Sequence, residues 1–180
     1  KDGDEYKLEY SEKSIGRVHS FFGNFGVFVR AYTYIIMNGP KGLRSVSENA
    51  IINANYLHAL VKDNFKVPYA ERGMHEFVLS ADNQKKLGAN AKDIAKRLLD
   101  YGFHAPTVYF PLIVHECMLI EPTETETLES IQAFADAMNK IADEARENVE
   151  LLTSAPLNTP IKRVNDALAA RNLNVRWTAE

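Results

Sequence analysis

The stretch that decides the fold is NAKDIAKRLLDYGFHAPTVYF, residues 90–110. Asn90 belongs to the residue types that cap helix N-termini, and Gly102 to those that end helices. Between them, apolar side chains recur with helical spacing on one face. Thr107 then opens a run of β-branched and aromatic residues, which is typical of a strand. A helix that passes within a few residues into a strand predicts an α/β unit.

The segments on either side extend this unit. MHEFVLS (74–80) predicts a strand and ADNQKKLG (81–88) a loop, while TVYFPLIV (107–114) and CMLIEP (117–122) are strand-like. Thr123 and Glu126 have the spacing of a capping box, and apolar residues with helical spacing follow over a long helix. The order strand, helix, strand, strand, helix predicts a small α/β (α+β) sandwich, with helices on one face of a largely antiparallel sheet.

Two helices are predicted before the sandwich. Residues 21–37 are apolar on nearly every side, Gly39 stands where a helix would end, and Pro40 suits the first turn of the next helix. That second helix has one apolar face and ends near Asn64. Beyond Asn148 we expect an extended tail with one short helix. The predicted divisions are an N-terminal arm (1–20), two linking helices (21–72), the sandwich (73–147) and the tail (148–180).

Composition narrows the function classes. The 180 residues carry a net charge of −3, which argues against a nucleic-acid or anionic-membrane partner. Residues 21–37 are too short, and too polar at Asn24 and Arg30, to span a bilayer. The polar N-terminus has no signal-peptide pattern. The single cysteine, Cys117, excludes an internal disulfide and is more typical of a small buried residue than of a nucleophile.

Motifs for self-contained catalysis are absent. The sequence has no G-x-G-x-x-G, G-x-x-x-x-G-K-[ST], H-E-x-x-H or G-x-S-x-G. Its five histidines lack the spacing that would place two ligands on one helix face, so no metal site is expected. The acidic run EPTETETLES suits a helix start. His104 could close the helix before it or stand at the rim of a pocket, and His75 is similarly open between a core residue and a base.

Several stretches together resemble the C-terminal region of glycine decarboxylase, the P-protein of the glycine cleavage system. The most specific are GFHAPTVYFPLIV (102–114) and IEPTETE (120–126), and the resemblance runs in order from about Ser14 to Trp177. One departure is VHECMLIEP, where relatives usually carry an acidic residue and alanine in place of His115 and Cys117. This departure lies in a predicted strand.

The resemblance implies a pyridoxal-phosphate enzyme with an aspartate-aminotransferase-like fold, of which this chain is the small C-terminal domain. Such an enzyme decarboxylates glycine and passes the aminomethyl group to the lipoyl arm of H-protein. None of the twelve lysines has the sequence context of the Schiff-base lysine, so the chain by itself is expected to bind no cofactor and to be inactive.

The resemblance also implies sites and partners. The catalytic candidates are His104 and His75, and the pocket candidates are Asn24 and Thr107. The expected partners are a large pyridoxal-phosphate-binding domain or subunit, lipoylated H-protein and further copies in a homo-oligomer, in the cytoplasm of a bacterium or the mitochondrial matrix of a eukaryote. The alternative is a stand-alone ferredoxin-like binding or regulatory module.

Overall fold

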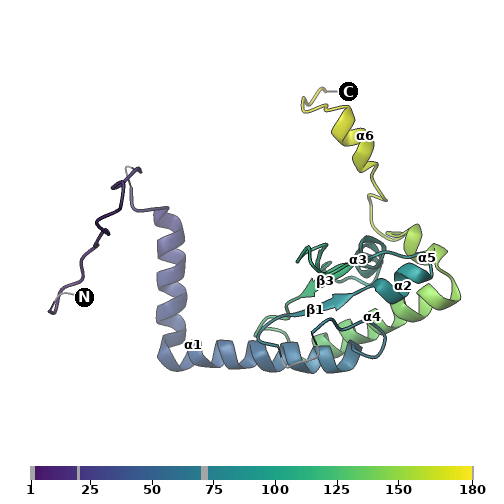
Figure 1. The fold of residues 1–180 in the computed structure, drawn as a ribbon, viewed down its shortest axis with the longest axis horizontal. Helices are drawn as coiled ribbons and strands as arrows, with labels where there is room; N and C mark the ends of the chain where they lie inside the picture. Colours follow the sequence, from purple (N-terminus) through teal and green to yellow (C-terminus); the bar gives the residue numbers. More distant parts are fainter. Residues whose placement is uncertain (1–2, 20, 70–72, 180) are drawn as a thin grey trace. The chain divides into compact units, whose positions relative to one another are not determined.

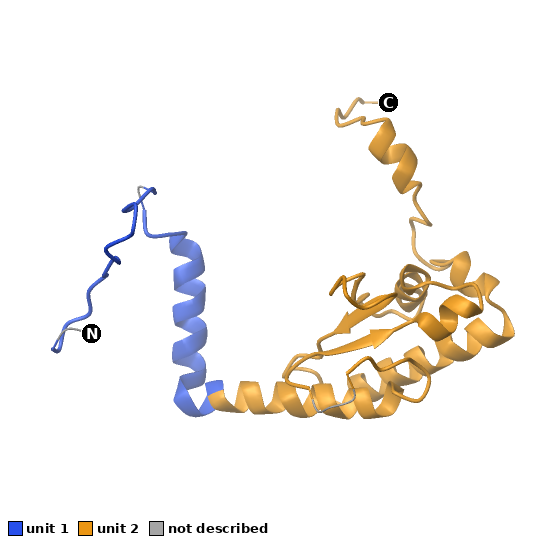
Figure 2. Cartoon of the chain, viewed as in Figure 1, with its two compact units in different colours: residues 1–43 blue, residues 44–180 orange. Residues whose placement is uncertain are grey.

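The computed structural model describes residues 3–19, 21–69 and 73–179 (Figure 1). The chain divides into two compact units, residues 1–43 and residues 44–180 (Figure 2). The elements in chain order are α1 (Phe25–Val61), β1 (Phe77–Ser80), α2 (Asp82–Lys86), α3 (Ala91–Asp100), β2 (Thr107–Val108), β3 (Cys117–Ile120), α4 (Leu128–Glu147), α5 (Glu150–Thr153) and α6 (Asp166–Arg171).

Helix α1 consists of two helical segments that meet at Gly39. The backbone of Gly39 has φ 61° and ψ −178°, which interrupts the helix, and Pro40 follows at the first turn of the second segment. A left-handed φ suits glycine because it has no side chain to clash with the backbone. The predicted break at Gly39 and Pro40 is confirmed. The second segment ends at Val61, three residues before the predicted end at Asn64.

The sheet has three antiparallel strands in the order β1-β3-β2. Leu79 pairs with Met118 and Phe77 with Ile120, while Val108 of β2 pairs with Met118 on its other side. Because side chains alternate along a strand, these five residues share one face of the sheet. All five belong to, or pack against, the buried core cluster that α3, α4 and the second segment of α1 complete. The predicted sheet with helices on one face is therefore confirmed.

Helix α3 begins and ends at the predicted residues. The Asn90 side chain accepts from the backbone N–H of Asp93 at 2.9 Å, and the Asp93 carboxylate accepts from the N–H of Asn90 at 2.9 Å. These two bonds satisfy donors that the first turn of a helix leaves unpaired. At the other end Gly102 has φ 81°, which reverses the chain toward β2. The helix is thus fixed at both ends, and its exit positions the turn that carries His104.

Several local predictions are corrected. The first strand starts at Phe77 rather than residue 74, and residues 82–86 form α2 instead of a loop. Of residues 107–114 only the first two are strand, because Tyr109 takes φ 60° and turns the chain. The cap of α4 is Thr127, whose side chain accepts from the N–H of Ser130, and not Thr123. The tail holds two short helices, α5 and α6, rather than one.

The turn between β2 and β3 is anchored by polar contacts. His115 lies in this turn, before β3, and not in a strand as predicted. Its Nδ1 lies 2.5 Å from Oδ1 of Asp82, and Lys66 Nζ lies 2.5 Å from the other oxygen of that carboxylate. The backbone carbonyl of His115 also accepts from the Ser80 hydroxyl at 2.8 Å. One carboxylate therefore ties the turn to the residues before β1 and after it.

Cys117 begins β3 and is fully buried, as predicted. Its thiol donates to the carbonyl oxygen of Phe110 at 2.8 Å, and burial raises the pKa of the thiol. A buried thiol with a raised pKa is a poor nucleophile, because the thiolate is the reactive form. Cys117 is accordingly a packing residue that helps to hold the same turn.

The Asp82 contacts predict a pH dependence of stability. The hydrogen bonds from His115 and Lys66 lower the pKa of Asp82 from 3.8 to about 2. Their contribution is complete above pH 3.8 and is lost as the pH falls toward 2, because protonation then favours the unfolded chain. Asp82→Asn should lower the free energy of unfolding at pH 7 by about 1 kcal/mol. The same variant should also lose less stability than the unmodified chain as the pH falls from 3.8 to about 2.

Urea unfolding at a series of pH values measures this effect. Asp63→Asn is the matched control, because Asp63 is exposed and precedes the sheet without belonging to the anchor. The control should follow the unmodified chain across the pH range. An Asp82→Asn curve that also follows it would show that the anchor adds nothing to stability.

Candidate functional site

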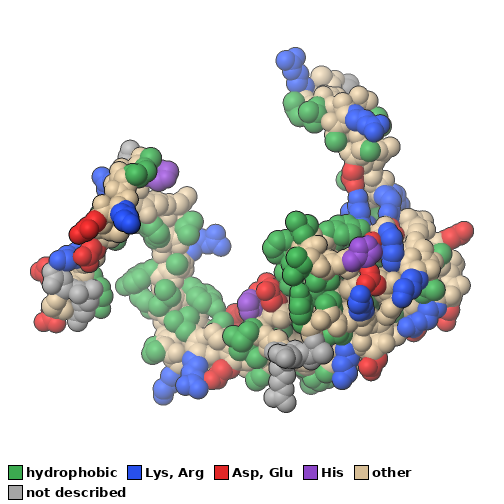
Figure 3. Space-filling model, viewed as in Figure 1, with side chains coloured by type: hydrophobic (Ala, Val, Ile, Leu, Met, Phe, Trp, Pro, Cys, Tyr) green, Lys and Arg blue, Asp and Glu red, His purple; other side chains and the backbone are tan. Residues whose placement is uncertain are grey.

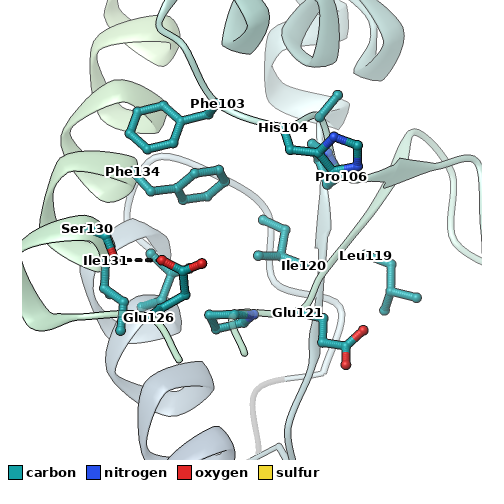
Figure 4. A pocket seen from close by; sticks show the side chains of 13 residues that line it. Phe103, His104, Pro106, Leu119, Ile120, Glu121, Glu126, Ser130, Ile131 and Phe134 are labelled. Atoms are coloured by element: carbon teal, nitrogen blue, oxygen red, sulfur yellow. Dashed lines mark hydrogen bonds between the residues drawn. The ribbon is translucent and has the colours of Figure 1, made fainter. Parts of the chain in front are cut away.

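The candidate site is a pocket within residues 44–180, with a cavity volume of about 280 Å³. It lies where the turn after α3 (103–106), the end of β3 and the first turns of α4 meet, and Leu57 of α1 also lines it. Figure 4 shows these walls around the cavity. The site is therefore built by segments up to about 77 residues apart in sequence, which the core brings together.

The greater part of the lining is apolar. Phe103 and Phe134 face each other edge to face, with ring centroids 5.3 Å apart and planes at 88°. This is a favoured arrangement for two aromatic rings. Leu57, Ile120 and Ile131, which are almost completely buried, complete the apolar walls. Such a surface holds hydrocarbon and excludes water.

Four polar side chains distinguish the pocket from a plain apolar hollow: His104, Glu121, Glu126 and Ser130. The Ser130 hydroxyl donates to Oε2 of Glu126 at 2.6 Å, and Figure 4 shows this pair at one wall. His104 stands beside Pro106 on another side, and its imidazole makes no hydrogen bond within the described residues. A carboxylate and an imidazole thus share one cavity. Both groups can accept a proton or a hydrogen bond.

The first turn of α4 supplies its own partners. The Thr127 side chain accepts from the N–H of Ser130 at 3.2 Å, and the N–H of Ile131 bonds to the carbonyl of Thr127 at 3.0 Å. The pKa of Glu129 is lowered by a bond from its own backbone N–H and by the Thr127 side chain. The end of the helix that attracts anions is therefore already occupied by residues of the chain.

The structure places the four predicted site residues differently. His104 lines the pocket, whereas Thr107 in β2 and His75 before β1 do not. Asn24 lies in the other unit, where its side chain accepts from the N–H of Val27 at 3.3 Å and caps α1. Within residues 44–180, the structure does not place His75 and Thr107 in the pocket with His104. A catalytic or binding role for each remains a prediction.

Glu126, Ser130 and Phe134 were not predicted as site residues. Glu126 was interpreted only as part of a helix cap, and Phe134 only as one residue of an apolar helix face. Ser130 and Phe134 lie four residues apart on one side of α4, which is a signal the sequence does contain, and Glu126 directly precedes the helix cap Thr127. Nothing in the sequence, however, showed that this side of α4 faces the turn of His104.

The described part of the chain offers no metal site, since no three His, Cys, Asp or Glu side chains converge there. Among the same residues, no helix is long and apolar enough to cross a membrane.

Comparison with known families gives the identity. Residues 46–164 match the family model of the C-terminal domain of glycine dehydrogenase. The chain belongs to this family. The match covers the sheet, α2 to α5 and the whole pocket, and it confirms the resemblance that the sequence showed.

Curated relatives extend the match to almost the whole chain. The probable glycine dehydrogenase (decarboxylating) subunit 2 of Pelodictyon phaeoclathratiforme is 61% identical over 177 residues, which are 97% of this chain and 37% of that protein. The protein of the same name from Alkaliphilus oremlandii is 55% identical over 181 residues, or 100% of this chain and 37% of that protein. The chain thus spans little more than a third of the length of these relatives.

A solved structure agrees with the fold. The crystal structure of glycine decarboxylase (P-protein) of the glycine cleavage system, in inhibitor-bound form, matches with a TM-score of 0.53 at 24% identity. The match covers 61% of this chain and 24% of that one. At this identity the likeness concerns the fold, and it supports the predicted fold class.

Proposed function

We propose that the chain is the C-terminal part of a pyridoxal-phosphate enzyme that decarboxylates glycine and transfers the aminomethyl group to the lipoyl arm of H-protein. The observation that carries this proposal is the 61% identity over 97% of the chain to a protein named glycine dehydrogenase (decarboxylating) subunit 2. Identity at this level over nearly all residues indicates that the two chains share the same fold. The name "subunit 2" supports a second subunit as partner.

The residues of the pocket do not fit the covalent attachment of pyridoxal phosphate. Among the described residues, the lining contains no lysine. Lys66, Lys85 and Lys92 form ion pairs with Asp82, Glu116 and Asp166 elsewhere on the surface. When bound, the cofactor withdraws electrons from the bond that breaks in decarboxylation. Its anchoring lysine is therefore expected outside these 180 residues.

The contribution of this chain is a wall of the reaction site with His104 as a base. The amino group of glycine is an ammonium near neutral pH and must lose a proton before its nitrogen can act as a nucleophile. The imidazole of His104 has no hydrogen-bond partner in the described residues, so its nitrogen is available to accept that proton. Because His104 is exposed in this chain, water is excluded from the reacting atoms only when the rest of the enzyme covers the pocket.

The first segment of α1 supports a large partner surface. Its apolar side chains are extensively exposed, as the hydrophobic residues in Figure 3 show; they are Phe25, Val27, Phe28, Val29, Tyr32, Tyr34, Ile35, Ile36 and Met37. Exposed apolar surface of this extent marks an interaction site. We infer that the remainder of the enzyme covers it, and that the assembled enzyme is a homo-oligomer in the cytoplasm. A stand-alone module would leave it bare.

The test is the exchange of the glycine carboxyl group with labelled bicarbonate. The full-length protein that contains this chain, assembled with its partner subunit, should catalyse the exchange when pyridoxal phosphate is present, and H-protein should increase the rate. The 180-residue chain by itself should show no exchange above background. An assembled enzyme that loads the cofactor and does not exchange label would contradict the proposal.

A further inference from the structure

We propose that the pocket between the turn of His104 and the start of α4 binds an aliphatic group that ends in an ammonium. The pocket combines apolar walls with an incompletely paired carboxylate, and among the described residues its lining contains neither lysine nor arginine. This binding follows from the pocket alone and does not depend on the proposed function.

The apolar walls determine the body of the ligand. Phe103 and Phe134 form one wall, Ile120 and Ile131 lie below and beside them (Figure 4), and Leu57 also lines the cavity. Burial of hydrocarbon contributes roughly 0.8 kcal/mol for each CH2 group removed from water. A cavity of about 280 Å³ is at the lower end of the volumes found for small-molecule sites. The ligand body is therefore a short alkyl chain rather than a nucleotide or a large ring system.

The charges of the pocket determine the end of the ligand. Glu126 uses Oε2 to accept from Ser130, and within the described residues its Oε1 has no hydrogen-bond partner. Glu121 adds a second carboxylate at the rim, directed away from Glu126 (Figure 4). A cation at the cavity is attracted by both, whereas an anion is repelled. Across the cavity, the free imidazole of His104 can accept a second hydrogen bond from an ammonium.

The start of α4 does not reverse this preference. A helix N-terminus attracts anions through its unpaired N–H groups. Here Thr127 and Glu129 already occupy these groups, since the pKa of Glu129 is lowered by bonds from its own backbone N–H and from Thr127.

The experiment titrates the 180-residue chain with three probes of equal length: pentylammonium, 1-pentanol and pentanoate. Methyl NMR signals of Ile120 and Ile131 report binding in the pocket. We expect pentylammonium to shift these signals at the lowest concentration and 1-pentanol to need a concentration about threefold higher. Pentanoate should need the highest concentration of the three. Added salt should reduce the difference between the ammonium and the alcohol, because it screens the carboxylates.

Glu126→Gln tests the role of the carboxylate. Because the Glu126 side chain is exposed, the fold should tolerate the change. The variant should bind pentylammonium and 1-pentanol with almost equal affinity, since only the affinity for the ammonium should fall, by about threefold. Glu129→Gln is the matched control, because Glu129 lies in the first turn of α4 and does not line the pocket. This control variant should leave the order of the three probes unchanged. Equal binding of all three probes to the unmodified chain, or no shift of either isoleucine signal, would overturn the proposal. Neither result would bear on the carboxyl exchange assay, which tests the proposed function separately.

Discussion

Replacing His104 with alanine in the full-length protein is expected to lower the rate of glycine–bicarbonate exchange by about 100-fold, the lower range of what a positioned acid or base contributes. His104 is the only predicted catalytic candidate among the described residues that lines the pocket. Without its imidazole, the proton of the glycine ammonium would have to pass to water. Cofactor loading, measured by absorbance, should stay unchanged because no lysine is altered.

His115→Ala is the matched control for this experiment. His115 is an exposed histidine of the same unit, but it pairs with Asp82 and does not line the pocket. It should keep exchange within about twofold of the unmodified enzyme, since surface changes rarely exceed a few tenths of a kcal/mol. If His104→Ala behaved like His115→Ala, the imidazole of His104 would have only a structural role.

Replacing Glu144 with alanine is expected to lower the free energy of unfolding by about 3 kcal/mol. Glu144 is buried in α4, where Arg97 donates to both its oxygens at 2.9 Å and the Tyr101 hydroxyl donates at 2.7 Å. These contacts join α3 to α4. Without the carboxylate, a largely buried guanidinium keeps, within the described part of the chain, only Asp100 as an ionic partner, at 3.1 Å. Urea unfolding measures the loss.

Two further variants separate the ionic contact from the helix itself. Glu147→Ala removes an exposed carboxylate one turn later on α4 and should change stability by less than about 0.5 kcal/mol. Arg97→Met combined with Glu144→Leu and Asp100→Asn should recover much of the loss, because the guanidinium and both carboxylates that pair with it are then removed from the interior. A Glu144→Ala variant as stable as Glu147→Ala would show that the network adds nothing to the packing of α3 on α4.

Local patterns in the sequence were sufficient for the helices. Helix α3 begins after Asn90 and ends before Gly102, as predicted. Capping and a left-handed backbone depend on only a few neighbouring residues, so the sequence is sufficient to locate them. The break of α1 at Gly39 and Pro40 has the same origin. The strand pairing was inferred from the order of elements, and the register of β1 on β3 bears it out.

Tertiary contacts determined what the sequence left open. Residues 109–114 have strand-forming composition, but the left-handed φ of Tyr109 and the anchoring of the turn by Asp82 and Cys117 end β2 after two residues. Of the residues that line the pocket, only His104 was a predicted site residue, and its role stays a prediction. Glu126 lines the same pocket because the chain that enters α4 packs toward the turn after α3, which no local pattern indicates.

The most direct measurement locates the lysine that holds the cofactor. Borohydride reduction of the full-length protein loaded with pyridoxal phosphate makes the covalent link permanent, and peptide mapping by mass spectrometry then identifies the modified residue. The label should appear on a lysine outside the 180 residues described here, with Lys66, Lys85 and Lys92 unmodified. A stoichiometric label on any of the twelve lysines of this chain would contradict the account.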